Sequence, residues 1–492
     1  MSTSAAAVAD ESTGKRKGPW RWIRWVLLVI LILLILLFAT VVFVLLRYNI
    51  PSNVNGLTAQ SVCSGTFVAG RNADEVFTQD VAPQSPVTSL VSTTVDEANR
   101  SVSAKFLGMF EREAALLPDR GCVLDVTPDP NVTPYTVTEP IPAPWPQGDA
   151  AEKPTQWGPG VNKAKLLAAV AKAFEGAGDP NAANARAVAV VQDGRLLVSQ
   201  AAPGFTTTTP LLGWSMTKTV NAMLFAQLAD KANLDMSTKV VDVFPEGKEP
   251  PWVAQWRQDE RSTITLDDLL FMRAGLDNAD DYGPLASVVQ MLYGEPSMAD
   301  FAAESPSVHP PGTFWAYSTG ISDIISQISR SRFPDDKAYW AYPKASLFAP
   351  IGADTASLFT DTSGTWVGGS YLWADVGDWA KLGQVMLDDG KWQNRQVLPA
   401  GFWKWAGTPA MPDGEGHGYG RQTWIPGQPV GGECANTGVP PDTLTMEGHY
   451  GQLVAMVPSK NAVVVRLGWT ITSSNFDSCE FLGDVLAALP AK

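Results

Sequence analysis

The stretch GWSMTKTV, residues 213–220, places Ser215 three residues before Lys218 at the start of an apolar helical pattern. Side chains at positions i and i+3 of a helix share one face, so the two groups can meet. The first turn of a helix has unpaired N–H groups that would stabilise an anionic oxygen on Ser215. A helix cap beside a solvated lysine is the alternative interpretation. That alternative suits a second S-x-x-K match, Ser12 to Lys15, in the polar N-terminal tail.

The residues on both sides of this stretch predict an α+β fold. Within residues 215–232 an apolar residue recurs at every fourth position, at Met216, Val220, Leu224 and Leu228, which indicates a helix. The other expected elements are a helix at Lys165–Gly178, a hairpin at 185–200 turning at Asp193-Gly194, a second hairpin at 452–469 and a closing helix at 481–489. We therefore expect an antiparallel sheet built from both ends of the domain, flanked by helices, with a helical subdomain inserted.

The residues before this domain have a different character. Residues 47–160 are expected to be an appended segment with one helix at Ser103–Leu117. Nine prolines lie between Pro128 and Pro159, which predicts an extended connector. The main domain is assigned to residues 161–492.

Length, composition and charge set broad limits. A chain of 492 residues predicts one large domain or two ordinary ones, and 45% apolar residues suffice for a sizeable core. The net charge of −14 argues against nucleic acid as a partner, because binding to phosphate needs a basic face.

The N-terminus predicts a membrane anchor. From Trp25 to Leu46 there are 22 consecutive residues without a charge. As a helix they would span roughly 33 Å, against a bilayer core of about 30 Å. Basic residues cluster before this run (Lys15, Arg16, Lys17, Arg21 and Arg24), and Arg47 alone follows it closely. The positive-inside rule therefore predicts a cytoplasmic tail at 1–24, a transmembrane helix at 25–46 and an extracytoplasmic, periplasmic remainder.

The four cysteines fit an oxidising compartment. No C-x-x-C motif is present and no histidine lies at metal-ligand spacing, so neither a metal site nor a cofactor is expected. Three disulfide connectivities are possible. Pairing within each end of the chain, Cys63 with Cys122 and Cys434 with Cys479, is the expected one, and free buried thiols are the alternative.

Five blocks in order resemble the serine-reactive β-lactamase and penicillin-binding-protein superfamily over about residues 185–485. The most similar branch is class C, with the related family VIII esterases, D-aminopeptidases and 6-aminohexanoate-dimer hydrolases. The blocks are the hairpin followed by LLGWSMTKTV, STITLDDLLFMRAGLD at 262–277, PPGTFWAYSTGISDIIS at 310–326, GGSYLWADVGDWAKLGQVML at 368–387 and GHYGQLVAMVPSKNAVVVRLG at 448–468. The resemblance implies the β-lactamase/transpeptidase-like fold.

The same resemblance implies catalytic roles. Ser215 matches the acyl-accepting nucleophile and Lys218 its proton acceptor. Tyr317 matches the tyrosine of the Y-x-N motif, whose phenol would relay a proton toward the leaving group. Thr319 stands where β-lactamases often have asparagine, so a side-chain amide for holding substrate is missing.

The third motif of the family, usually K-T-G, differs more strongly in this chain. In the preferred register residues 446–448 (Met-Glu-Gly) take its place, so that Gly448 precedes the backbone N–H of His449. That N–H and the N–H of Ser215 would form the oxyanion hole. Residues 449–451, His-Tyr-Gly, are an alternative register. The missing lysine removes a positive charge that suits the carboxylates of penicillins.

The three histidines of the chain allow a competing arrangement, a Ser-His-Asp triad, but no serine lies in a G-x-S-x-G motif. His309 and His417 are therefore interpreted as loop residues. Candidate pocket residues are Trp214, Trp315, Thr319 and Tyr450.

Together these features predict a membrane-anchored, cofactor-free serine hydrolase that cleaves amide bonds, including those of linear oligoamides or short peptides, or small carboxylic esters. A β-lactamase or D,D-peptidase acting on cell-wall peptides is the first alternative. A non-catalytic ligand-sensing ectodomain is the second.

Overall fold

The computed structural model describes residues 20–135, 139–179, 181–281, 283, 285–429, 432–435 and 437–492. The chain divides into two units, Met1–Ile50 and Pro51–Lys492. The second S-x-x-K match, Ser12 to Lys15, lies outside the described residues, as does most of the expected cytoplasmic tail.

The described part of the first unit is the helix α1, Trp20–Arg47. Its 28 residues give a length of about 42 Å. Within it, Trp22–Arg47 is long and apolar enough to cross a membrane, a property that signal sequences share. The expected transmembrane helix at 25–46 coincides with this segment.

A five-stranded antiparallel sheet lies at the centre of the second unit. Its strand order is β12-β13-β14-β5-β6, so the first and last strands of the domain are neighbours. The strands are β5 Ala185–Gln192, β6 Arg195–Ala201, β12 Leu444–Gly448, β13 Gln452–Val457 and β14 Ala462–Gly468. Val464 of β14 pairs with Val190 of β5. This pairing confirms the predicted sheet built from both ends of the domain.

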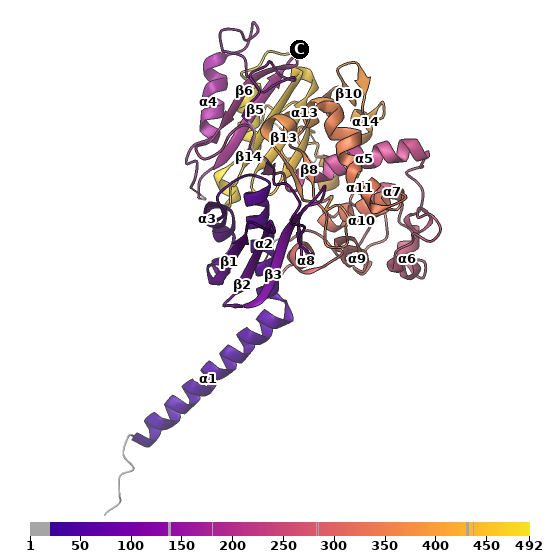
Figure 1. The fold of residues 1–492 in the computed structure, drawn as a ribbon. Helices are drawn as coiled ribbons and strands as arrows, with labels where there is room; N and C mark the ends of the chain where they lie inside the picture. Colours follow the sequence, from indigo (N-terminus) through magenta and orange to yellow (C-terminus); the bar gives the residue numbers. More distant parts are fainter. Residues whose placement is uncertain are drawn as a thin grey trace, which may run out of the picture. The chain divides into compact units, whose positions relative to one another are not determined.

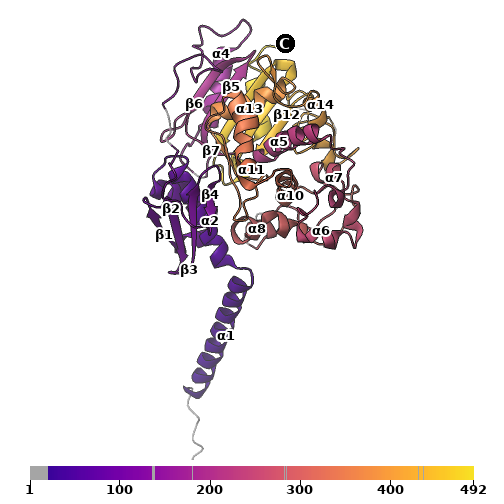
Figure 2. The same ribbon diagram turned by 45° about the vertical axis from the view of Figure 1, so that its right-hand side comes forward.

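Helices cover both faces of this sheet (Figures 1 and 2). The pair α4, Lys163–Ala173, and α15, Ser478–Leu486, packs on the face that carries Val188 and Val190. The opposite face packs against α5, Met216–Ala232, and α13, Val376–Leu387. Successive side chains of a strand point to opposite faces, so β5 supplies apolar residues to both layers.

The helical subdomain is inserted between α5 and the last strands. It contains α6 Pro251–Trp256, α7 Leu266–Leu270, α8 Ser287–Gly294, α9 Met298–Ala303, α10 Thr319–Arg330, α11 Asp336–Pro343 and α12 Ala349–Ile351. A small sheet of β7 Leu211–Leu212, β9 Leu372–Ala374 and β8 Ser357–Leu358 joins the chain before α5 to the chain before α13. The shorter elements β10 Lys391–Trp392, β11 Arg395–Gln396 and α14 Phe402–Ala406 follow α13.

The N-terminal segment of the second unit consists of helices and a separate four-stranded sheet. The helix α2, Ile50–Phe67, is followed by α3, Ala73–Val76, and then by a four-stranded antiparallel sheet. The strands are β1 Val91–Asp96, β2 Ser101–Phe106, β3 Met109–Leu117 and β4 Gly121–Leu124. The segment shares one apolar core with the helical subdomain, in which Val62 and Ala59 are buried together with Leu292.

The prediction of a helix at Ser103–Leu117 is wrong. Residues 101–106 and 109–117 are paired strands, and the two-residue turn between them is Leu107-Gly108. Both turn residues have positive φ, 49° and 75°, which a helix cannot contain. The run of alanine, glutamate and leucine after the turn favoured a helix by propensity, but pairing on both sides of β3 makes it a strand.

Both expected disulfides are present. Cys63 of α2 is joined to Cys122 of β4, and Cys434, before β12, is joined to Cys479 of α15. The first bond ties α2 to the four-stranded sheet. The second ties the loop before the edge strand β12 to the helix layer.

Candidate active site

Ser215 lies at the start of α5, directly after a tightly packed turn. A Cβ atom at Gly213 would lie 2.1 Å from the indole of Trp379, so only glycine fits there. Trp214 has a left-handed backbone with φ of 49°, which turns the chain from β7 into the helix. Within the described part of the chain, the Ser215 side chain makes no capping bond to α5. Its hydroxyl is therefore available to other groups.

Lys218 is the group that contacts this hydroxyl. Its Nζ donates to Ser215 Oγ at 2.9 Å, to Thr319 Oγ1 at 2.9 Å and to the carbonyl oxygen of Gly369 at 3.0 Å. An ammonium has three donors, and all three have acceptors here. Lys218 is only 1% exposed, so its position is fixed and water is excluded from it.

Burial lowers the pKa of Lys218 to about 8, because the charged form loses its hydration. Two carboxylates oppose this shift, Asp280 and Asp323. Asp280 Oδ2 is 4.0 Å from Lys218 Nζ. Asp280 also accepts hydrogen bonds from Thr319, from the backbone N at 2.7 Å and from Oγ1 at 2.6 Å. A lysine with this pKa has an appreciable neutral fraction near neutral pH, as a general base requires.

Tyr317 completes the cluster. The Ser215 side chain interacts with its phenol and partly offsets the effect of burial on the pKa of Tyr317. The Lys218 ammonium lies 4.7 Å from the centroid of the Tyr317 ring, and the ring stacks on Trp424 at 5.3 Å. Burial raises the pKa of Tyr317 well above its ordinary value, so the phenol keeps its proton. A neutral phenol at this place can donate to a leaving group.

The edge strand β12 brings the third motif to the nucleophile. A Cβ atom at Gly448 would lie 2.2 Å from the carbonyl oxygen of Gly213, so the strand end lies directly against the turn before Ser215. His449 follows Gly448, and its ring meets the Trp214 indole edge-on at 5.6 Å. Burial lowers the pKa of His449 to about 4, which keeps the imidazole neutral.

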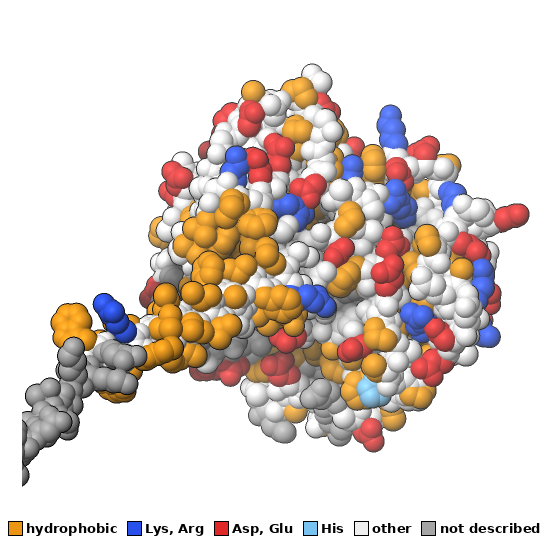
Figure 3. Space-filling view, turned by 90° about the horizontal axis from the view of Figure 1, so that it is seen from below, with side chains coloured by type: hydrophobic (Ala, Val, Ile, Leu, Met, Phe, Trp, Pro, Cys, Tyr) orange, Lys and Arg blue, Asp and Glu red, His pale blue; other side chains and the backbone are white. Residues whose placement is uncertain are grey.

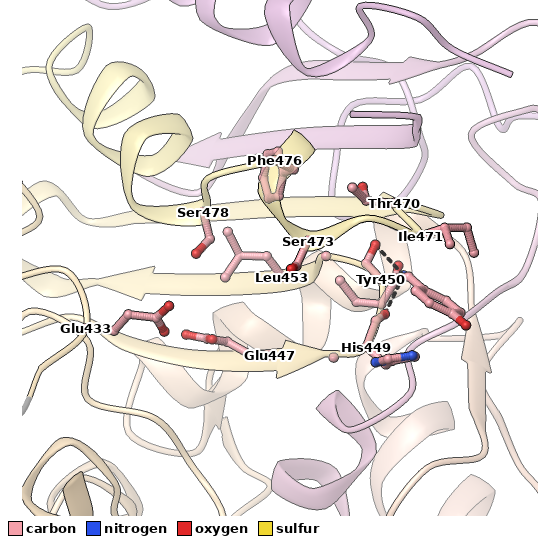
Figure 4. A pocket seen from close by; sticks show the side chains of 13 residues that line it. Glu433, Glu447, His449, Tyr450, Leu453, Thr470, Ile471, Ser473, Phe476 and Ser478 are labelled. Atoms are coloured by element: carbon pink, nitrogen blue, oxygen red, sulfur yellow. Dashed lines mark hydrogen bonds between the residues drawn. The ribbon is translucent and has the colours of Figure 1, made fainter. Parts of the chain in front are cut away.

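A cavity of about 290 Å³ lies beside this motif (Figure 4). It is lined by the 447–453 turn and by residues after β14, including Thr470 and Phe476. Figure 4 shows the carboxyl groups of Glu447 and Glu433 turned toward one another in this cavity. Burial raises the pKa of Glu447 to about 7, and Glu433 adds to the shift. In the expected register, residues 446–448, Glu447 is the middle residue of the third motif.

Aromatic rings surround the nucleophile on two sides. Trp214 packs against His449, Tyr450 and Trp469. On the other side, Trp315 packs with Tyr317, Tyr419 and Trp424. The buried indole N–H groups of Trp214 and Trp315 have no hydrogen-bond partner among the described residues.

The other two histidines, His309 and His417, make contacts away from Ser215. His309 stacks on Phe314 with centroids 4.0 Å apart, and His417 Nδ1 is 3.1 Å from the carbonyl oxygen of Met411. Among the described residues, no group of three or more His, Cys, Asp or Glu side chains is arranged to hold a metal ion.

Sequence reasoning missed three groups around Lys218. Asp280 comes from the loop between α7 and α8, where neighbouring aspartates give no spacing signal. Gly369 contributes only its carbonyl oxygen, and its N–H donates to Asp323 Oδ1 at 3.1 Å. Asp323 could have been found, because it lies one helical turn after Thr319. Burial raises the pKa of Asp323 well above its ordinary value.

An antiparallel sheet between helix layers, with a helical subdomain beside it, is the β-lactamase-like fold. The sequence profile of the Beta-lactamase family matches residues 170–474, and the chain belongs to this family. None of the curated protein sequences matches the chain.

Several solved structures are similar to part of this chain. A family VIII carboxylesterase superposes with a TM-score of 0.52 at 13% identity, over 68% of this chain and 98% of the other. EstCE1, a hydrolase with promiscuous acyltransferase activity, has a TM-score of 0.47 at 14% identity, over 66% of this chain and 98% of the other. A beta-lactamase from Mycobacterium bovis has a TM-score of 0.42 at 17% identity, over 62% of this chain and 94% of the other. The expected superfamily and fold class are confirmed.

Proposed function

We propose that this protein is a membrane-anchored serine hydrolase that cleaves amide or ester bonds through an acyl-enzyme on Ser215. The observation that carries the proposal is the 2.9 Å contact between Lys218 Nζ and Ser215 Oγ, made by a lysine that is almost fully buried. An ordinary helix cap would leave the lysine in solvent, with its pKa near 10.4.

The proposed acylation begins with neutral Lys218, which takes the proton of the Ser215 hydroxyl while Oγ bonds to the substrate carbonyl carbon. The carbonyl oxygen becomes an oxyanion, held by the backbone N–H groups of Ser215 and His449. When the tetrahedral intermediate collapses, the bond to the leaving amine or alcohol breaks. Tyr317 gives that group a proton and is reprotonated from Lys218.

Deacylation repeats these steps with water in place of the serine. A water molecule loses a proton to the Lys218–Tyr317 pair and bonds to the acyl carbon. The bond to Ser215 Oγ then breaks, Oγ regains a proton, and the carboxylic acid leaves.

The third motif favours substrates without a carboxylate at this position. Where relatives of the K-T-G type carry a lysine, this chain has Met446, followed by the acidic Glu447. A carboxylate there repels the anionic group of penicillins and D-Ala-D-Ala peptides. Linear amides, oligoamides and small neutral esters therefore fit better than cell-wall substrates.

The proposed location is the outer face of a membrane. In this arrangement residues 1–24 are cytoplasmic, α1 spans the bilayer and the hydrolase unit lies outside. The two disulfides support an oxidising compartment. Removal of residues 1–47 should release most of the activity from the membrane fraction, and a membrane-bound share equal to that of the full chain would contradict α1 as the anchor.

A substrate panel tests the proposed activity. Hydrolysis of p-nitrophenyl acetate, a linear 6-aminohexanoate dimer and nitrocefin is measured with the wild type, Ser215→Ala, Lys218→Ala and the control Lys165→Ala, whose side chain is exposed on α4. We expect ester and amide turnover that both site variants abolish and the control retains. Rapid nitrocefin turnover would instead support a β-lactamase. An acyl-enzyme that accumulates without turnover would support the sensing alternative.

A further inference from the structure

Large apolar side chains are exposed together at one end of the four-stranded sheet. Leu107 is 59% exposed, Met109 55% and Phe110 45%, all at the turn between β2 and β3. Leu90, 46% exposed, adjoins them, because the Leu107 N–H donates to its carbonyl oxygen at 2.9 Å. We call these four residues the apolar tip. In Figures 1 and 2, β1, β2 and β3 lie low in the second unit, and Figure 3, which looks at that unit from below, shows hydrophobic side chains gathered on its surface.

Folding of the hairpin does not require these residue types. Phe106 pairs with Met109, so Leu107-Gly108 is a two-residue turn with positive φ at both positions. Asparagine or aspartate followed by glycine is the sequence that such turns favour. Leucine is strained in a left-handed backbone and buries little of its side chain here. An exposed apolar residue at a costly backbone position points to a role outside the fold.

The chain places the apolar tip near the end of the proposed span. The Nδ2 of Asn55, in α2, donates to the carbonyl oxygens of Met109 at 3.3 Å and Phe110 at 2.5 Å. Asn55 is eight residues beyond Arg47, the last residue of α1, and α2 begins at Ile50. The three steps along the chain from Arg47 to Ile50 reach at most about 10 Å, and the five helical steps from Ile50 to Asn55 add about 8 Å. With the Asn55 side chain and its hydrogen bond included, the tip is tethered within roughly 25 Å of the point where the chain would leave the bilayer.

We infer that the apolar tip inserts into the lipid headgroup region beside α1 and attaches the hydrolase unit to the membrane at a second point. This inference rests on the proposed anchoring by α1. The interfacial zone accepts leucine and phenylalanine side chains together with their turn. The charged neighbours Lys105 and Glu111 pair with each other at 3.2 Å, which lowers the cost of bringing them close to lipid.

The N-terminal segment of the second unit, which carries the apolar tip, also contacts the region of the candidate active site. The Tyr450 hydroxyl donates to Gln84 Oε1 at 3.2 Å, and Tyr450 directly follows His449, whose backbone N–H is the proposed oxyanion donor. A membrane contact at the tip therefore fixes the height of the site above the lipid surface, because tip and Gln84 belong to one compact unit.

Spin-label accessibility on the full-length chain in phosphatidylcholine–phosphatidylglycerol nanodiscs tests this inference. Nitroxides are placed at Leu107→Cys and Met109→Cys, with Leu167→Cys on α4 as the control because Leu167 is 46% exposed. The native cysteines do not interfere, because all four are in disulfides. We expect labels at 107 and 109 to be reached by oxygen and protected from a water-soluble nickel chelate. The label at 167 should show the opposite preference.

If labels at 107, 109 and 167 are equally accessible to the nickel chelate in chains that stay with the discs, the inference is overturned. The proposed anchoring by α1 would not be affected. Spin–spin broadening at 107 that depends on two chains per disc would overturn it in favour of a contact between copies. Chains that do not stay with the discs would overturn the anchoring and the inference together. Leu107→Asn, which suits the turn, should preserve the fold, and in combination with Met109→Cys it should reduce the protection of the label at 109.

Discussion

Lys218 Nζ donates to Thr319 Oγ1 at 2.9 Å, and Thr319 Oγ1 donates onward to Asp280 Oδ2 at 2.6 Å. Thr319 stands at the position where the resemblance places asparagine in many β-lactamases. In this chain the hydroxyl is engaged by the lysine and the aspartate rather than turned toward a ligand. The Thr319 hydroxyl therefore helps to hold Lys218 Nζ in place.

Replacing this hydroxyl should impair catalysis. In Thr319→Val the ammonium loses one of three acceptors, and a hydrogen bond to a charged group contributes about 1.5–3 kcal/mol. We expect kcat/KM for p-nitrophenyl acetate to fall about 10- to 100-fold. Thr319→Ser keeps the hydroxyl and should retain most of the activity, as measured by steady-state kinetics. Equal losses in the two variants would mean that the methyl group, not the hydroxyl, matters.

The pH dependence should report on Lys218. The base must be neutral, so kcat/KM should rise with pH and level off above about 8, the pKa of Lys218. Asp280 favours the charged lysine, so its replacement lowers that pKa. Asp280→Asn should therefore move the acidic limb of the pH–rate profile to lower pH, while Asp267→Asn should leave it in place, because the Asp267 carboxylate pairs with Arg421 at 2.8 Å. A limb that shifts upward in Asp280→Asn would contradict the assignment of Lys218.

Glu447 should govern discrimination against anionic substrates. Its pKa of about 7 means that it is largely ionised at pH 8 and largely protonated at pH 6. The ratio of kcat/KM for p-nitrophenyl acetate to that for p-nitrophenyl hemisuccinate should be larger at pH 8. Glu447→Gln should lower the ratio at pH 8 about tenfold, the size of one close charge interaction of about 1.4 kcal/mol. A ratio that neither pH nor the substitution changes would show that Glu447 does not face the acyl group.

Much of the fold follows from local patterns. Alternation and the Asp193-Gly194 turn predict the first hairpin, and a four-residue period predicts α5. The sequence predicts a helix where β3 lies because these residues favour helix locally, whereas their conformation depends on pairing with β2 and β4.

The site could be predicted only where its residues lie close in sequence. Ser215 and Lys218 share one helical turn, so spacing alone suggests their contact, which the structure contains. Asp280 and Gly369 reach Lys218 from loops 62 and 151 residues away, and only the folded chain brings them together. The catalytic roles of Ser215, Lys218 and Tyr317, and the register of the third motif, stay predictions.

The most direct measurement is intact-mass spectrometry of the detergent-solubilised protein mixed with p-nitrophenyl acetate and acid-quenched within seconds, beside Ser215→Ala. We expect one added acetyl group that maps to Ser215, decays as p-nitrophenol release continues, and is absent from Ser215→Ala. An acetyl group on another residue, or equal p-nitrophenol release by Ser215→Ala, would contradict the proposed nucleophile.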